Sequence, residues 1–169
     1  MKVKVLRTGA ICLLLLVTAM IITSVAIEEY PLAAESKQTI TASKIHNSVN
    51  EERLKLGLPL LTRDRSLDKS AIEKCYDMEL KNYMSHTMAD GSEFYVLIDK
   101  HSKYKKAGEN LASGYNTTEE VVSNWMRSPT HKENIVDPVY TNVGYGVCTS
   151  EYYQYGKDQV IVVQHFTQN

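Results

Sequence analysis

The sequence predicts a single α+β domain, with helices in its first part and an antiparallel pair of strands at its end. Two observations support this fold class. Apolar residues recur at helical spacing as far as Met126, and they alternate with small or polar residues after Pro138. The length of 169 residues also fits one domain.

Residues 1–26 have the pattern of an export signal. Three basic residues precede an uncharged apolar run at 9–27, and small residues at 24–26 suit cleavage by signal peptidase. The run is also long enough to span a bilayer. We therefore predict a cleaved signal peptide, with an uncleaved membrane anchor as the alternative. Either one makes the domain exported, as a secreted protein or one anchored on the extracytoplasmic side of the membrane.

Residues 27–42 are polar and lack periodicity, which predicts a tether, so the domain itself is expected at 43–169. Without the leader, 16 Lys and Arg residues face 20 Asp and Glu residues, a net charge of −4. This balance argues against nucleic acid or an anionic membrane surface as the partner. Contact with the membrane is expected only through the N-terminal segment.

Two cysteines belong to the domain, Cys75 and Cys148. An exported domain could join them in a disulfide. Each one, however, stands where its segment calls for an apolar residue, and unpaired cysteine is commonly buried. We predict two reduced, buried thiols and keep the disulfide as the alternative.

Helices are predicted in the first half of the domain. The first runs from about Ser43 to Leu56 and stops at Gly57, and one face carries Ile45, Val49, Arg53 and Leu56. The second runs from about Ser66 to Met84, and its core-facing stripe is Leu67, Ala71, Cys75 and Met78. A short third helix is expected at 93–100, before a basic loop at 101–106.

A helix stop and a helix start adjoin each other at 128–129. Thr117 and Glu120 have the spacing of a capping box and open the preceding helix. That helix ends at Ser128, which becomes the N-cap of a new helix with Pro129 as its first residue. His131 is then the third residue of the new helix.

Strands are predicted after Pro138. Val143, Tyr145 and Val147 alternate with small or polar residues, and residues 159–167 form a β-rich run that closes the chain. The connection between the two strands is expected at 151–158. Gly144 and Gly146 lie inside the first strand, which indicates close packing of another backbone rather than a phosphate-binding loop.

The candidate chemistry rests on histidines and one acid, because no nucleophile motif, zinc-protease motif or phosphate loop is present. His46 and His101 have the settings of surface residues. His165 alternates with Phe166 in the last strand, so a structural role on the opposite face is expected.

His131 and Glu109 have settings that suggest a site. A helix N-terminus disfavours an imidazolium, so His131 is expected to stay neutral, the form that binds divalent metals. Glu109 lies in a small, apolar segment, where burying an acid is costly unless it is paired or ligating.

Four motifs occur along the domain: N-x-x-R-x-x-x-G-L at 50–58, S-H at 85–86, G-E-N at 108–110 and W-M-x-S-P-x-H at 125–131. With them, residues 43–169 resemble the bacterial branch of the CAP superfamily. That superfamily also holds cysteine-rich secretory proteins, the venom allergens of the antigen 5 group and plant pathogenesis-related proteins. The resemblance implies an SCP-like α-β-α sandwich, with a small antiparallel sheet between helices.

In this superfamily two histidines and two acids meet in a shallow cleft, which in some members binds zinc or another divalent ion. By position, the resemblance assigns three metal ligands: His86, Glu109 and His131. Ser128 stands where many eukaryotic members have the second acid, and neither Glu120 nor Glu133 matches that position. Three ligands fit an open zinc site with water in the fourth place, or a site too weak to stay loaded.

Members of the superfamily have been credited with lipid and sterol binding, channel modulation, antimicrobial action and, in a few cases, proteolysis. Because the resemblance clusters His86, Glu109 and His131 without an identifiable nucleophile, we favour a non-enzymatic module whose cleft binds a small ligand, a lipid or a cell-surface partner, with zinc or another divalent ion as the candidate cofactor. The alternative is a zinc-dependent, peptidase-like hydrolase in which zinc activates water and Glu109 acts as the base. A third interpretation makes the cleft residues a purely structural polar network.

Overall fold

The computed structural model describes residues 40–150 and 159–169, within the second of two compact units, residues 33–169. The predicted leader, the tether up to residue 39 and the connection at 151–158 lie outside the described residues. Among the residues that are described, no helix is both long and apolar enough to cross a membrane.

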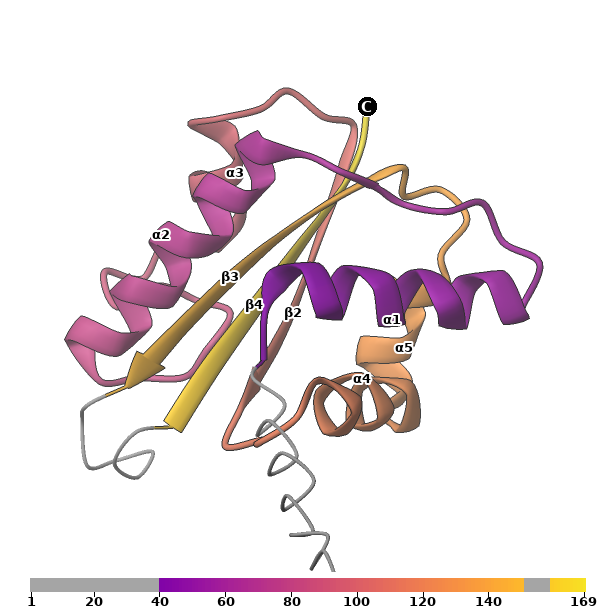
Figure 1. The fold of residues 1–169 in the computed structure, drawn as a ribbon. Coiled ribbons are helices and arrows are strands. Elements are labelled where there is room, and N and C mark those ends of the chain that lie inside the picture. Colours follow the sequence, from indigo (N-terminus) through magenta and orange to yellow (C-terminus); the bar gives the residue numbers. More distant parts are fainter. Residues whose placement is uncertain (1–39, 151–158) are drawn as a thin grey trace, which may run out of the picture. The chain divides into compact units, whose positions relative to one another are not determined.

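A four-stranded sheet lies between two layers of helices (Figure 1). In chain order the elements are α1 (Ala42–Lys55), β1 (Thr62–Arg63), α2 (Arg65–Lys81), α3 (Tyr95–Asp99), β2 (Lys106–Ser113), α4 (Thr118–Arg127), α5 (Pro129–Val136), β3 (Asn142–Ser150) and β4 (Gln159–Gln168). The strand order is β1-β3-β4-β2; β4 is antiparallel to both of its neighbours, and β1 is parallel to β3. Helices α2 and α3 cover one face, and α1, α4 and α5 cover the other. The predicted α+β class and α-β-α sandwich are confirmed.

The predicted helices form where local sequence specifies them. The apolar stripe of α2 is fully buried, and α1 buries three of the four residues predicted on its inner face, while Leu56 beyond its end is exposed. Thr117 and Glu120 form the expected capping box at the start of α4. Ile40 is packed in the core, so the folded part extends into the segment predicted as tether.

Strand β2 is absent from the sequence prediction. Its central residues, Gly108, Glu109 and Asn110, have low strand propensity. The strand forms because it pairs with β4 along its whole length, from Lys106 opposite Gln168 to the other end. Tertiary pairing therefore overrides local preference at this sheet edge.

Helix α2 lies directly on β3 because two glycines of β3 leave room for its backbone. A Cβ atom at Gly144 would stand 2.2 Å from the carbonyl carbon of Leu67. A Cβ atom at Gly146 would stand 2.2 Å from the carbonyl oxygen of Ala71. The close packing predicted for these glycines is confirmed.

Arg53 of α1 is fully buried and joins separate segments through its guanidinium. It donates hydrogen bonds to four main-chain carbonyls, those of Pro59, Ile135, Asp137 and Tyr140. Asn50, one turn earlier, bonds both the N–H (2.9 Å) and the C=O (3.1 Å) of Leu61. These two side chains explain the N-x-x-R motif: they fix the chain that leaves α1 and tie it to the connection after α5.

The prediction of two reduced thiols is wrong, because Cys75 of α2 and Cys148 of β3 form a disulfide. Both residues are buried, as their apolar positions indicated. The close approach of α2 to β3 places their Cα atoms 6.1 Å apart, within the range that a disulfide spans. That approach depends on tertiary packing, which the spacing of the two cysteines does not reveal.

Gly144→Ala should strongly destabilise the domain, because the new methyl group meets main-chain atoms of α2 that cannot rotate away. We expect the free energy of unfolding, measured by urea denaturation, to fall by about 3 kcal/mol. Gly57→Ala is the control: it has a positive φ of 69° but no atom within 4 Å of the added carbon. It should cost only about 1 kcal/mol, and equal losses in the two variants would contradict the packing argument.

Removal of the disulfide by Cys75→Ala with Cys148→Ala should lower the free energy of unfolding by about 4 kcal/mol, because the bridge links residues 73 positions apart in the unfolded chain. Thermal melts with and without reductant measure the effect. Wild type should lose stability on reduction, whereas the double variant should be indifferent. A melting temperature that stays constant while both thiols become titratable would refute the expectation.

Candidate functional site

A buried carboxylate connects two histidines at the edge of the sheet. The side chain of Glu109 in β2 is fully buried, and Glu109 pairs with His165 of β4 in the antiparallel register. His165 donates its Nε2–H to Oε2 of Glu109 at 3.0 Å, and His86 donates its Nδ1–H to Oε1 at 2.7 Å. Both carboxylate oxygens are therefore occupied by imidazole donors.

Two residues of α2 form hydrogen bonds to the two histidines. Ser70 Oγ lies 2.8 Å from Nδ1 of His165, and the Nζ of Lys74 donates to the carbonyl of His86 at 3.1 Å. Ser70, Lys74 and His165 are all fully buried. We call Ser70, Lys74, His86, Glu109 and His165 the Glu109 cluster.

His86 is the exposed end of the Glu109 cluster. Its side chain is 54% exposed, although the carboxylate it contacts is 0% exposed. The hydrogen bond to Glu109 raises the pKa of His86, against the opposing effect of burial, and the charge of Glu93 acts in the same direction as Glu109. Glu93 lies across an isolated β-bridge from Thr87, the residue after His86.

The charged form of Glu109 is favoured despite the burial of its side chain. Desolvation alone would raise its pKa, but the hydrogen bonds from His165 and His86 outweigh it, and the charge of Lys74 acts with them. The pKa of Glu109 is therefore held below its ordinary value. This agrees with the expectation that a buried acid at this position needs partners.

His131 lies where the sequence predicts, as the third residue of α5 behind Ser128 and Pro129. Its pKa is lowered by burial and by the charge of His86, in the direction expected from its helix position. Asn110 of β2 donates to its main-chain carbonyl at 3.1 Å and so holds α5 against the sheet edge. The Nδ1 atom of the His131 ring is buried and has no hydrogen-bond partner among the described residues.

The structure thus brings His86 and Glu109 into contact and places His131 within electrostatic reach of His86. Among the described residues, no group of three or more His, Cys, Asp or Glu side chains has an arrangement that could hold a metal ion. In this arrangement Glu109 orients His86, as carboxylates commonly do for metal-binding histidines, and the Nε2 of His86 is left for a ligand. Both carboxylate oxygens of Glu109 are engaged by histidines, so of the three residues assigned by resemblance only the imidazoles of His86 and His131 remain available to a ligand.

Glu120 and Glu133, the two acids considered as replacements for the missing second acidic ligand, are engaged elsewhere or exposed. Glu120 accepts hydrogen bonds from the N–H groups of Asn116 and Thr117 in the capping box. Glu133 is exposed on α5. Ser128, at the second acidic position itself, serves as the N-cap residue of α5 without a side-chain capping bond.

Three members of the Glu109 cluster were not predicted as site residues. His165 does lie on the face opposite to Phe166, as expected, but it contacts Glu109 directly. Ser70 and Lys74 are spaced four residues apart beside the apolar stripe of α2, which was the available signal for them. His46 and His101 are half-buried rather than ordinary surface residues; His101, for example, bonds Glu73 at 2.6 Å.

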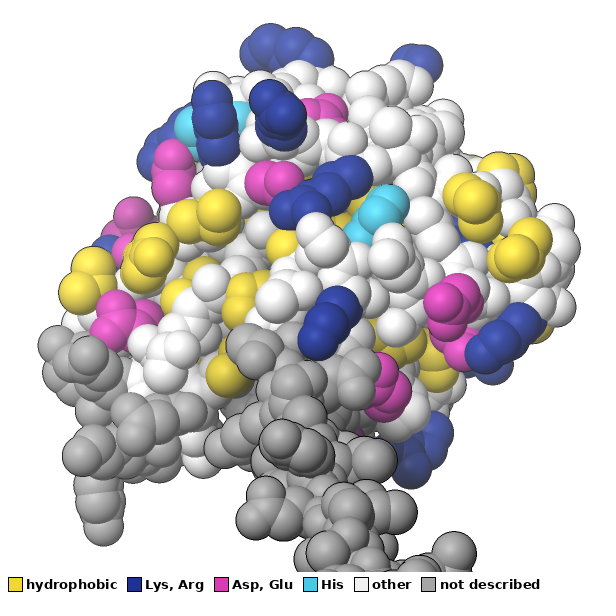
Figure 2. All heavy atoms as spheres, in the orientation of Figure 1, with side chains coloured by type: hydrophobic (Ala, Val, Ile, Leu, Met, Phe, Trp, Pro, Cys, Tyr) yellow, Lys and Arg dark blue, Asp and Glu magenta, His cyan; other side chains and the backbone are white. Residues whose placement is uncertain are grey.

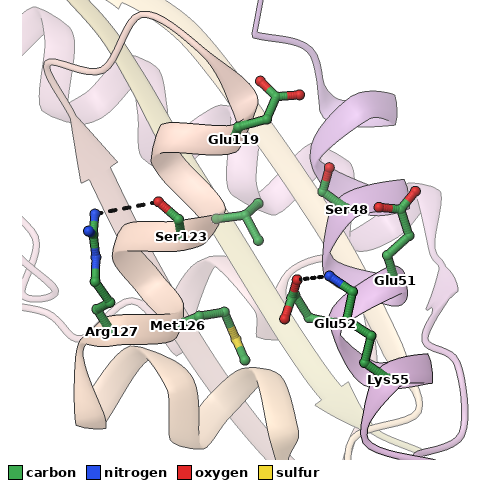
Figure 3. Close-up of a pocket in the computed structure, with 9 residues that line it drawn as sticks. Ser48, Glu51, Glu52, Lys55, Glu119, Ser123, Met126 and Arg127 are labelled. Atoms are coloured by element: carbon green, nitrogen blue, oxygen red, sulfur yellow. Dashed lines mark hydrogen bonds and ion pairs between the residues drawn. The ribbon is translucent and has the colours of Figure 1, made fainter.

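Two other surface features offer no comparable chemistry. Hydrophobic side chains gather over α2 in Figure 2. The exposed hydrophobic residues of this helix recur every four positions: Ile72, Tyr76 and Leu80. A groove of about 410 Å³ lies between α1 and α4, where Met126 points toward α1 (Figure 3). Glu52 and Lys55 on its α1 side form an ion pair at 2.6 Å, and its lining includes neither histidine nor cysteine.

Comparisons with known proteins identify the family of this chain. The CAP model, described as the cysteine-rich secretory protein family, matches residues 46–166. The Bacillus subtilis protein YkwD is 40% identical over 130 residues, covering 71% of this chain and 51% of YkwD. The membrane protein YlbC of the same organism is 32% identical over 118 residues, covering 69% of this chain and 34% of YlbC. This chain therefore spans about half of YkwD and a third of YlbC.

Solved structures show the same fold. An outer surface protein from Borrelia burgdorferi is 26% identical with a TM-score of 0.65, over 75% of this chain and 91% of that one. An extracellular protein with an SCP domain from Bacillus anthracis is 24% identical with a TM-score of 0.66, over 76% of this chain and 40% of that one.

Glu109→Gln should destabilise the domain by about 2 kcal/mol near neutral pH, because a buried charged hydrogen-bond acceptor is lost. A glutamate whose pKa is lowered by folding contributes stability above its ordinary pKa, and that contribution disappears as the pH falls through the lowered value. The difference in melting temperature between wild type and variant should therefore be large near about pH 6 and shrink toward about pH 3. Glu51→Gln, at an exposed glutamate of α1, is the control and should melt like wild type. A difference that stays constant with pH would contradict the assignment.

Proposed function

This chain belongs to the CAP family, the cysteine-rich secretory proteins, and on that premise we propose that it is an extracytoplasmic binding module whose recognition site is formed by His86 and His131. The supporting observation is that the Glu109 cluster leads from a buried carboxylate to an exposed imidazole. A fully buried carboxylate holds an imidazole whose side chain is 54% exposed. The charge inside the domain thus orients a group at its surface.

The exposure of His86 favours binding over a purely structural role. Burying a carboxylate costs several kcal/mol unless hydrogen bonds and opposite charges compensate. A network that served packing alone could end on buried groups, as the contact of Ser70 with His165 does. This one ends on His86, which is half-exposed and lies near a second imidazole, His131.

The chemistry of two imidazoles defines the class of ligand. Neutral imidazole nitrogens suit zinc, copper and nickel, and they also accept hydrogen bonds from polar ligands. A divalent cation bound there would supply an open coordination position for an anionic group of a small molecule, a lipid or a cell-surface partner. The chain's own contribution is to keep His86 oriented and His131 neutral.

The state of Glu109 supports binding rather than hydrolysis. The hydrolase alternative needs Glu109 as the general base, yet both of its oxygens accept hydrogen bonds from histidines. A carboxylate engaged in this way, with its pKa held low, is a poor proton acceptor for water. We therefore keep the hydrolase as an outcome that the experiment can reveal.

Zinc titration of the purified domain tests the proposal. We expect a calorimetric binding isotherm and a raised melting temperature for wild type, and the loss of both in His86→Ala/His131→Ala. The matched control is His46→Ala/His101→Ala, which removes the same number of histidines from other parts of the chain and should bind as wild type does.

Other results would redirect the interpretation. Flat isotherms for wild type together with lower melting temperatures for His86→Ala would favour the structural network. Turnover of peptide, ester or peptidoglycan substrates that disappears in His131→Ala would favour the hydrolase.

A further inference from the structure

We infer that His165 and Ser70 are positioning residues of the recognition site: they hold Glu109 so that His86 keeps its Nδ1–H on the carboxylate and presents Nε2 outward. The inference rests on the proposed function and deepens it, because it names the buried residues that decide which nitrogen of His86 is available to a ligand.

A continuous chain of hydrogen bonds carries the inference. It runs from Ser70 Oγ to His165 Nδ1 at 2.8 Å, from His165 Nε2 to Glu109 Oε2 at 3.0 Å, and from Glu109 Oε1 to His86 Nδ1 at 2.7 Å. Its buried members come from α2, β4 and β2, three elements that packing holds in place.

The chemistry of these groups fixes the position of two protons. An ionised carboxylate only accepts hydrogen bonds, so the nitrogens that face Glu109 must both carry hydrogen. His86 therefore has its proton on Nδ1 when it is neutral, and its lone pair is on Nε2. The same rule places a proton on Nε2 of His165 in either of its charge states.

Ser70 fixes the ring of His165 from the other side. Its Oγ lies 2.8 Å from His165 Nδ1 and 2.9 Å from the carbonyl of Leu67. The hydroxyl donates to that carbonyl and also contacts the ring nitrogen of His165, so its oxygen holds the imidazole in place. The ring of Phe94 packs against the same imidazole, with centroids 5.9 Å apart, and further limits its rotation.

The close approach of α2 to the sheet makes this contact possible. Gly144 is the register partner of His165 in β3, and its missing side chain admits the backbone of α2 at Leu67. Ser70 follows Leu67 by three residues and so reaches the histidine. Without the donor from His165, Oε2 of Glu109 would be buried and unsatisfied, and the carboxylate would be free to rotate away from His86.

Two substitutions of His165 separate its two hydrogen bonds. In His165→Gln the amide nitrogen reaches the former position of Nε2 and can still donate to Glu109. In His165→Asn the shorter side chain can bond Ser70 but cannot reach Glu109. We expect zinc affinity, measured by calorimetry, to fall by about 10- to 100-fold in His165→Asn, as for the loss of other groups that orient a metal-binding histidine. His165→Gln should bind zinc within about threefold of wild type, by the same reasoning.

Nitrogen chemical shifts of the imidazole rings, recorded without metal above the pKa of His86, give a second readout. Wild type and His165→Gln should show His86 in the Nδ1–H form, whereas His165→Asn should show a mixture of tautomers. This measurement needs no zinc, so a protein that binds no zinc but shows these shifts would refute the proposed cation binding and leave the positioning roles standing.

Some results would overturn the inference. These are equal tautomer changes in the Asn and Gln variants, or no change in either. If His165→Asn does not fold, Ser70→Ala replaces it; loss of the hydroxyl should shift the tautomer balance in the same direction by a smaller amount, and an unchanged balance would also overturn the inference.

Discussion

The contact between α2 and β3 is the constraint on which the rest of the structure depends. Gly144 and Gly146 remove two side chains from the face of β3 that α2 covers, so the two backbones lie against each other. From that approach follow the disulfide, the reach of Ser70 to His165 and the placement of Lys74 behind the His86 segment. A bulkier residue at either glycine would separate the helix from the sheet and dismantle the buried end of the Glu109 cluster.

Buried charge in this domain is organised for two purposes. Arg53 is fully buried, satisfies its guanidinium on main-chain carbonyls and joins connecting segments. Glu109 satisfies its carboxylate on two imidazoles, and one of them, His86, is half-exposed. The hydrogen bonds of Arg53 stabilise the scaffold. Those of Glu109 hold the ring of His86, a surface group, in one orientation. The contrast distinguishes the proposed recognition site from the structural polar groups.

Elements with a clear local pattern could be predicted, including the two final strands, whereas features that show only through distant contacts could not. The stripe of α2, the capping box of Thr117 and the new helix at Pro129 are local, and all three are present. Strand β2 exists only through β4, and the Cys75–Cys148 disulfide only through the packing of α2 on β3. For the site, resemblance supplied His86, Glu109 and His131. The role of His165 could not be predicted, because its partners come from β2 and α2.

The way Arg53 is bonded bears on how this fold can diversify. Every residue offers a main-chain carbonyl whatever its side chain, so an arginine that bonds only to carbonyls places almost no demand on the identity of the residues it joins. The loop after α1 and the connection after α5 can therefore drift in sequence while their geometry persists. One arginine in this position therefore fixes the course of two connections and leaves the choice of their side chains open to other demands, such as the recognition of a partner.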